Sequence, residues 1–182
     1  HFFFVAMTNF FRKTIYELFH SLMLRLPQRI ALRNQMRITT YGKASNSLFW
    51  SMFTSSEYLS FVPYLLRLQK NPALLIDCGA ALGYFSLLVE HLIRSKVLAW
   101  NSLQYILIEP MRDNYKKLQF NVDGNLQGCE LKKGLVGKKD GAEKFYSNSF
   151  LPWSGSIHSK NRLNRSDEIS YIDLTAELSA HF

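Results

Sequence analysis

Apolar residues follow two different periods along this chain, and the changes between them mark the expected elements. Between residues 73 and 122, short apolar runs alternate with amphipathic stretches, which predicts the order strand, helix, strand, helix. The strands are expected over 73–78 and 104–109, and the helices over 84–94 and 111–122. This order is typical of an α/β fold, in which right-handed crossovers join parallel strands in a helix-covered sheet.

The flanking segments carry weaker patterns. Before the alternating region, residues 9–26 have the spacing of an amphipathic helix that Pro27 ends. Polar residues over 35–47 predict a loop or short strand, and 48–69 is helix-compatible with an interruption near Pro63. After the alternating region we expect a third strand over 129–136 and candidate strands over 144–147 and 169–174.

The composition is that of a folded chain, with 47% apolar and 20% charged residues among 182. Two cysteines, Cys78 and Cys129, imply no disulfide framework, so a reducing compartment and a cytoplasmic location are the default expectation. The apolar start, residues 1–7, is too short for a membrane span and lacks the basic region of a signal peptide. Because the first residue is His1, we expect a piece of a longer reading frame.

The net charge of +8 is unevenly distributed. Residues 1–70 hold nine Lys and Arg against two Asp and Glu, whereas residues 71–182 hold thirteen against twelve. A basic first third is compatible with a solvated face, or with peripheral contact to a membrane surface or another anionic partner. No aromatic and basic motif of a nucleic-acid module accompanies it, so we expect no nucleic-acid partner.

The candidate chemistry lies in the stretch LLIDCGAALGYFS, residues 74–86. Asp77 ends the first strand, and Gly79 follows it at a turn that allows a ligand to approach the backbone. Glu109 ends the second strand, and Pro110 is expected at the first position of the following helix, a site that proline favours. Ligands bind beyond the carboxyl ends of such strands, where an acid accepts hydrogen bonds from ribose hydroxyls. The two acids therefore predict a nucleoside-bearing cofactor.

The glycine spacing distinguishes between cofactors. A dinucleotide site has the pattern G-x-G-x-x-G, whereas this chain has Gly79-x-x-x-Gly83 with Ala81 in the middle position. An acid two residues before the first glycine would repel a pyrophosphate but would pair with a cationic amino acid group, which favours S-adenosylmethionine. A nicotinamide cofactor remains the rival, and the acids have a purely structural alternative as caps of neighbouring helices.

Three stretches in order resemble the successive motifs of FkbM-type methyltransferases, a branch of the class I S-adenosylmethionine-dependent fold. These stretches are residues 77–86, 108–118 and 135–146, and the segment FTSSEY at 53–58 is similar to the one that precedes them. The resemblance covers residues 48–178. It implies a Rossmann-like class I methyltransferase sheet, of which the front part is present, with an N-terminal helical extension.

The resemblance also implies roles for individual residues. The methionine part of the cofactor would be lined by Asp77, Gly79, Ala80 and Gly83, with Tyr84 and Phe85 at the start of the helix beside it. Glu109 would bind the ribose. The adenine would be faced by Pro110, Met111 and Leu135. The family usually has Asn in place of Ala81.

By the same resemblance the chain would transfer a methyl group to a hydroxyl of a sugar, glycan or secondary metabolite. The family's later Asp-x-Glu-Gly motif is absent, so we expect a basic, partly helical extension over 1–47 and a methyltransferase domain over 48–182 that is incomplete at its C-terminus. The alternative is a non-catalytic or truncated homologue that keeps a nucleoside pocket or an interaction surface. No metal site is expected, and no catalytic base is assigned, because His158 is most simply an exposed loop residue.

Overall fold

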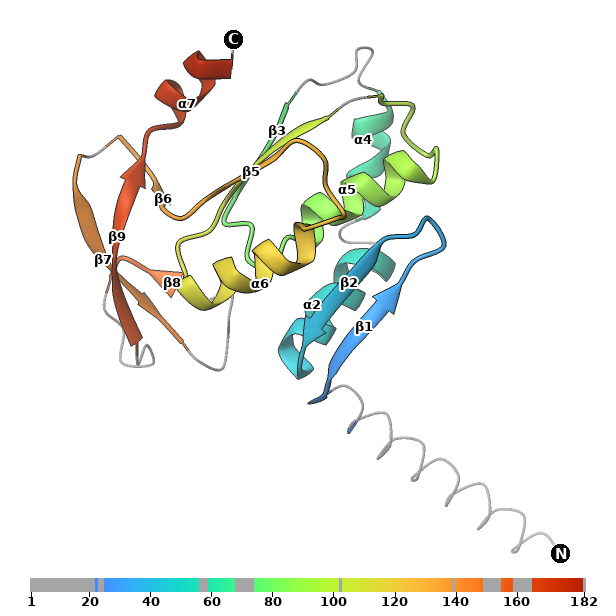
Figure 1. Cartoon of the computed structure of the whole chain (residues 1–182), viewed down its shortest axis with the longest axis horizontal. Helices are drawn as coiled ribbons and strands as arrows, with labels where there is room; N and C mark the ends of the chain where they lie inside the picture. The colour runs from blue at the N-terminus through green and yellow to red at the C-terminus, as the bar shows by residue number, and fades with distance from the viewer. Residues whose placement is uncertain are drawn as a thin grey trace, which may run out of the picture.

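The computed structural model describes residues 22, 25–55, 59–67, 74–101, 103–138, 140–148, 155–158 and 165–181 (Figure 1). The helix predicted over 9–26 lies outside these residues, apart from Leu22 and Arg25. The elements form a mixed α/β arrangement. In chain order they are β1 (Pro27–Ala31), β2 (Arg37–Tyr41), α2 (Lys43–Thr54), α4 (Val62–Leu66), β3 (Leu74–Cys78), α5 (Tyr84–Arg94), β4 (Gln104–Ile108), α6 (Arg112–Val122), β5 (Cys129–Lys132), β6 (Leu135–Val136), β7 (Ala142–Ser147), β8 (Gly155–Ser156), β9 (Arg165–Ile172) and α7 (Leu174–His181).

The central sheet has three parallel strands in the order β3-β4-β5, and the predicted order of strand, helix, strand, helix is confirmed. Both crossovers move through the sheet in the same direction, so α5 and α6 cover the same face. Leu107 of β4 and Leu131 of β5 pack there with Leu87 of α5 and Leu118 of α6. The residues of β4 from Tyr105 onward are fully buried because β4 is the middle strand.

The described start of the expected helical extension is a β-hairpin rather than a helix. β1 pairs antiparallel with β2, and the side chains alternate with the period of a strand, so that Ile30 and Ile38 face the core opposite each other. Met36 and Ile38 have no exposed surface and belong to the same cluster as Leu87 of α5. The hairpin therefore shares one core with the sheet, and the division expected between residues 47 and 48 falls inside α2.

Asn121 of α6 and Asn125 in the turn that follows α6 bind the backbone of β2 as a neighbouring strand would. Asn121 accepts from Thr39 N at 2.9 Å and donates to Thr39 O at 3.1 Å. Asn125 accepts from Arg37 N at 3.1 Å and donates to Arg37 O at 2.7 Å. Asn125 Nδ2 also donates to Asn121 O at 2.7 Å, so the two asparagines lie next to each other, and they meet residues i and i+2 of the strand. Asn121 also donates to Leu82 O at 3.1 Å and so connects the hairpin to the turn after β3.

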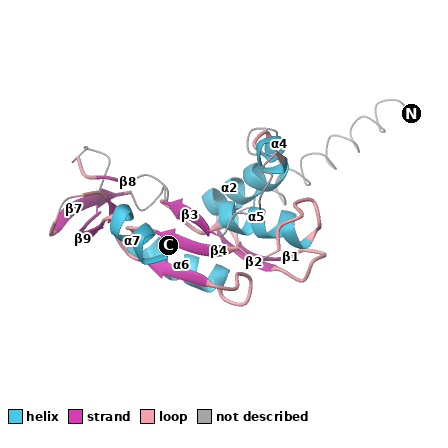
Figure 2. Ribbon diagram, turned by 90° about the horizontal axis from the view of Figure 1, so that it is seen from above, coloured by secondary structure: helices cyan, strands magenta, loops and turns pink. Residues whose placement is uncertain are grey.

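The strand predicted over 129–136 divides into two strands that belong to different sheets. β5 pairs with β4, whereas β6 pairs in parallel with β9 in a second sheet of order β6-β9-β7-β8. The break lies at Gly134, where a Cβ atom would meet the side chain of Ile172. Figure 2 shows the second sheet to one side of the central one.

Element boundaries differ most from the prediction in two places, and α6 begins at Arg112, so that Pro110 lies two residues before the helix rather than at its first position. The helix predicted over 48–69 is two helices in the described residues, and Pro63 lies in the first turn of α4, where its missing N–H costs no hydrogen bond. The strand predicted to reach residue 174 ends at Ile172, because Asp173 begins α7 by accepting from Thr175 N at 2.8 Å. No helix in the described ranges is long and apolar enough to cross a membrane.

We predict that Asn125→Ala lowers the free energy of unfolding by about 2–3 kcal/mol, because it leaves the N–H and C=O groups of Arg37 without their partner. Urea unfolding measures this change. The matched control is Gln119→Ala, an exposed amide on α6, which should cost less than about 0.5 kcal/mol. Equal effects of the two substitutions would contradict the strand-like role of Asn125.

Candidate functional site

Asp77 and Glu109 lie at the same edge of the central sheet. The parallel register of β3 and β4 places Cys78 opposite Ile108, so the residues next to this pair, Asp77 and Glu109, both sit at the carboxyl ends of their strands. The two acids are close enough that the charge of Asp77 raises the pKa of Glu109. The expected convergence of two carboxyl groups beside one turn is therefore present in the structure.

The turn after β3 is fastened to the end of β4. Gly79 N and Ala80 N both donate to Ile108 O, at 2.8 and 3.0 Å. Gly79 has φ +80°, which favours glycine, and a Cβ there would meet no atom within 4 Å. Gly83 also has φ +80°, but its Cβ would lie 2.7 Å from Leu118 Cδ1, so this position needs glycine for the close approach of α6 as well. Gly79 is thus favoured by its backbone conformation alone, and Gly83 by its backbone conformation and by the close packing of α6.

Glu109 uses its carboxylate within the protein. Its Oε2 accepts from Ala81 N at 2.8 Å, and its Oε1 accepts from Met111 N at 2.9 Å and from Asn114 Nδ2 at 3.4 Å. Its exposed fraction is only 3%. Burial raises the pKa of Glu109 and the charge of Asp77 raises it further, while the three hydrogen bonds lower it. The carboxylate therefore links the turn after β3 to the start of α6, which is close to the structural alternative considered for this acid.

Asp77 is half-buried and binds the first turn of α5. Ser86 Oγ donates to Asp77 Oδ2 at 2.7 Å. Burial raises the pKa of the Asp77 carboxyl, and the Ser86 hydrogen bond offsets only part of this rise. The sequence reasoning gave no role to Ser86 or to Asn114. Both could have been predicted as partners of the acids, since each lies in the first turn of the helix that follows a strand-end acid.

The remaining residues expected at the site divide into two groups. Ala80, Pro110 and Met111 lie with the acids at the edge of the central sheet. The side chains of Tyr84 and Phe85 have other partners: Tyr84 Oη bonds Ser45 Oγ at 2.6 Å, and the Phe85 ring packs against Phe61. Leu135 lies in the second sheet, where it pairs with Tyr171. His158 is exposed, and its backbone N donates to Ser156 Oγ.

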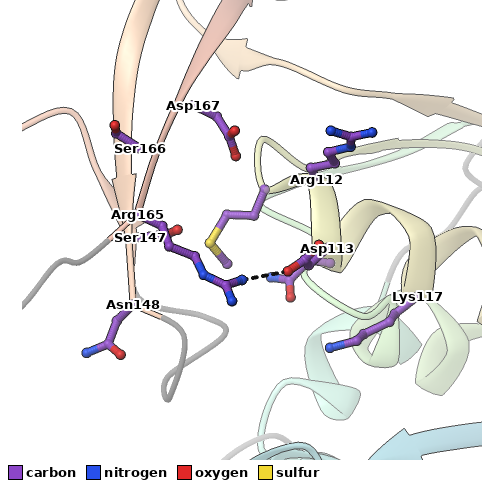
Figure 3. A pocket seen from close by; sticks show the side chains of 10 residues that line it. Arg112, Asp113, Lys117, Ser147, Asn148, Arg165, Ser166 and Asp167 are labelled. Carbon is purple, nitrogen blue, oxygen red and sulfur yellow. Dashed lines mark hydrogen bonds and ion pairs between the residues drawn. The ribbon is translucent and has the colours of Figure 1, made fainter.

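A cavity of about 350 Å³ lies between the N-terminal half of α6 and the β7–β9 pair (Figure 3). Met111 and Asn114, which both bond Glu109, line it from the side of the central sheet. Arg165 of β9 reaches toward α6 and binds Asp113 at 2.8 Å (Figure 3). This volume is in the range of small-molecule sites. Across the described ranges, no three His, Cys, Asp or Glu side chains are grouped as a metal site would need.

We predict that Asp77 makes stability depend on pH. Because its raised pKa lets the folded state keep a proton that the unfolded chain has lost, the free energy of unfolding falls as the pH rises above the ordinary Asp value of about 4. Asp77→Asn should remove the share of this fall that Asp77 causes, since its amide oxygen still accepts from Ser86, whereas Glu109, whose pKa is also raised, keeps its own share. Urea unfolding at several pH values measures it, with the exposed Asp123→Asn as the control. Parallel pH profiles of the wild type and Asp77→Asn would contradict the prediction.

The comparisons with known proteins identify no relative of this chain. No protein-family model matches it, and neither the curated proteins nor the solved structures contain a significant match. The functional conclusion therefore depends on the residues of the site and on their geometry.

Proposed function

We propose that the chain binds S-adenosylmethionine at the carboxyl edge of β3 and β4 and is a methyltransferase of the FkbM type with a Rossmann-like sheet. The observation that carries the proposal is the parallel register that brings Asp77, Glu109 and the turn over 79–83 to one edge. Open α/β sheets bind nucleoside ligands at this edge. The acceptor we propose is a hydroxyl of a sugar, glycan or secondary metabolite.

In this proposal each acid binds a different part of the cofactor. Ser86 occupies Oδ2 of Asp77, and Oδ1 pairs with the cationic amino acid group of the cofactor. An adjacent cation would also offset the cost of keeping this half-buried carboxylate ionised. A pyrophosphate at the same place would be repelled by both acids, which argues against a dinucleotide.

Ribose binding by Glu109 requires a change in its present hydrogen bonds. A carboxylate has about four lone-pair sites, and three donors already point at this one. The contact from Asn114 is the longest, at 3.4 Å, so in the proposal a ribose hydroxyl takes its place. Met111 then lies next to the adenine, at the mouth of the cavity between α6 and the second sheet.

Methyl transfer from a sulfonium is an in-line displacement, so catalysis consists largely of holding the acceptor oxygen and the methyl carbon in line and near contact. The bond from the acceptor oxygen to the methyl carbon forms as the sulfur–carbon bond breaks, and a base takes the hydroxyl proton. We assign no residue of this chain as that base.

A second candidate, a chain that binds no cofactor, is favoured by one observation. The Glu109 carboxylate is 3% exposed and its hydrogen bonds come from the protein itself, so the acid has a complete structural role without a ligand. Calorimetry with S-adenosylmethionine, S-adenosylhomocysteine and NADH separates the candidates. We expect binding of the first two and none of NADH; no heat with any of the three supports the second candidate.

We predict that Glu109→Ala weakens binding of S-adenosylhomocysteine by on the order of 1–3 kcal/mol, because the hydrogen bonds to the ribose are lost. A 2′-deoxy analogue of the ligand distinguishes this loss from a loosened turn. The wild type should bind the analogue more weakly than the parent ligand, and Glu109→Ala should bind the two alike. The exposed Asp123→Ala is the control and should keep the preference. A preference that survives in Glu109→Ala would remove the ribose role.

A further inference from the structure

The described residues of the N-terminal third carry positive charge without any negative charge. Over 25–55 and 59–67 there are six cationic side chains and no Asp or Glu. All six are exposed, and none forms an ion pair in the described part of the chain. They are Arg25, Arg29, Arg33, Arg37, Lys43 and Arg67. A solvated face of an ordinary domain mixes both signs, so this separation of charge needs its own reason.

The hairpin gathers several of these charges on one surface. Paired residues of antiparallel strands share a face, and the register pairs Arg29 with Thr39 and Arg37 with Ala31. Arg29 and Arg37 are therefore diagonal neighbours on the face opposite the buried Ile38. Lys117 of α6 adds a cation beside the end of the hairpin, because its Nζ lies 5.3 Å from the centre of the ring of Tyr41, a half-buried residue that also packs against the core. We call Arg29 and Arg37, with the neighbouring Lys117, the basic hairpin face.

Two exposed leucines lie just before β1 in the chain. Leu22 and Leu26 are 56% and 48% exposed, on either side of Arg25. Asn46 Nδ2 donates to Leu26 O at 3.1 Å, which fixes the backbone of Leu26 against α2 while its side chain stays in solvent. Exposed leucines gain free energy by entering hydrocarbon, but they gain nothing from the phosphates of a nucleic acid. The combination of cations and leucines favours a lipid surface over RNA or DNA.

We propose that the basic hairpin face, together with Leu22 and Leu26, binds the surface of an anionic lipid bilayer. The cations attract the acidic headgroups, and the leucines enter the boundary between headgroups and acyl chains. The proposal does not depend on the methyltransferase function, because the hairpin face and the edge that carries Asp77 use different residues. It gives a reason for the absence of acidic residues over 25–55, which the packing of the hairpin does not require.

Sedimentation of the full chain with lipid vesicles tests the proposal. We expect binding to vesicles of phosphatidylcholine with phosphatidylserine, no binding to phosphatidylcholine alone, and weaker binding as salt is raised. The double variant Arg29→Gln with Arg37→Gln should bind about 30-fold more weakly, at about fivefold per charge. The control is Lys133→Gln with Lys138→Gln, which removes two exposed cations from another part of the chain and should lose less than about threefold. Equal losses in the two double variants, or no vesicle binding by the wild type, would overturn the proposal.

A second variant separates lipid from nucleic acid. Leu26→Ser should weaken vesicle binding severalfold while leaving any binding to a single-stranded RNA oligonucleotide unchanged. Tighter binding to the RNA than to the vesicles, with the same loss in the arginine double variant, would assign the face to a nucleic acid instead. Unchanged vesicle binding by Leu26→Ser would likewise overturn the proposed entry of the leucines.

Discussion

The carboxylate of Glu109 is the interaction on which the edge of the central sheet depends. It bonds Ala81 N in the turn after β3 and Met111 N at the start of α6, and it is itself held at the end of β4. Three segments that are separate in the sequence thus meet at one buried charge. Ala81 has φ +50°, an uncommon value for a residue with a Cβ, and the hydrogen bond from its N–H stabilises this conformation. Without this acceptor the N–H of Ala81 would lose its partner, and the turn would depend on its bonds to Ile108 O and Asn121.

This structural use of Glu109 bears directly on the proposed function. A site that is ready for its ligand usually keeps some polar atoms free, whereas the oxygens of Glu109 already have donors. Asp77 is different, because it is half-buried and Ser86 engages only one of its oxygens in the described part of the chain. Cofactor binding at this edge would therefore begin at Asp77 and require Asn114 to yield at Glu109. In that case Asp77 would contribute an ion pair with the amino acid group of the cofactor, and Glu109 would contribute hydrogen bonds to the ribose.

The parts of the fold that the sequence predicted are those with local signals. The helix over 84–94 has the predicted bounds, because Gly83 and an amphipathic period define it within a few residues. The hairpin was missed because the outer edge of β2 is paired by Asn121 and Asn125, which lie 82 and 88 residues further along the chain than the residues they bind. The break at Gly134 lies where the Ile172 side chain packs against the backbone, and no local sequence pattern reveals this contact. At the site, the edge position of the two acids was predictable from strand ends, but the hydrogen bond that Glu109 accepts from Ala81, 28 residues away, was not.

The asparagine contacts of β2 also have a consequence for the order in which the chain acquires its structure. The hydrogen bonds from Arg37 and Thr39 to Asn125 and Asn121, at and just beyond the end of α6, span 88 and 82 residues of sequence. During synthesis on the ribosome the hairpin emerges long before α6 exists, and closing so large a loop is slow. Until then the outer edge of β2 has its N–H and C=O groups unpaired and can add a strand from another chain. The arrival of α6 ends that period, so the nascent chain is most vulnerable to misassembly while residues 42 to 120 are being made.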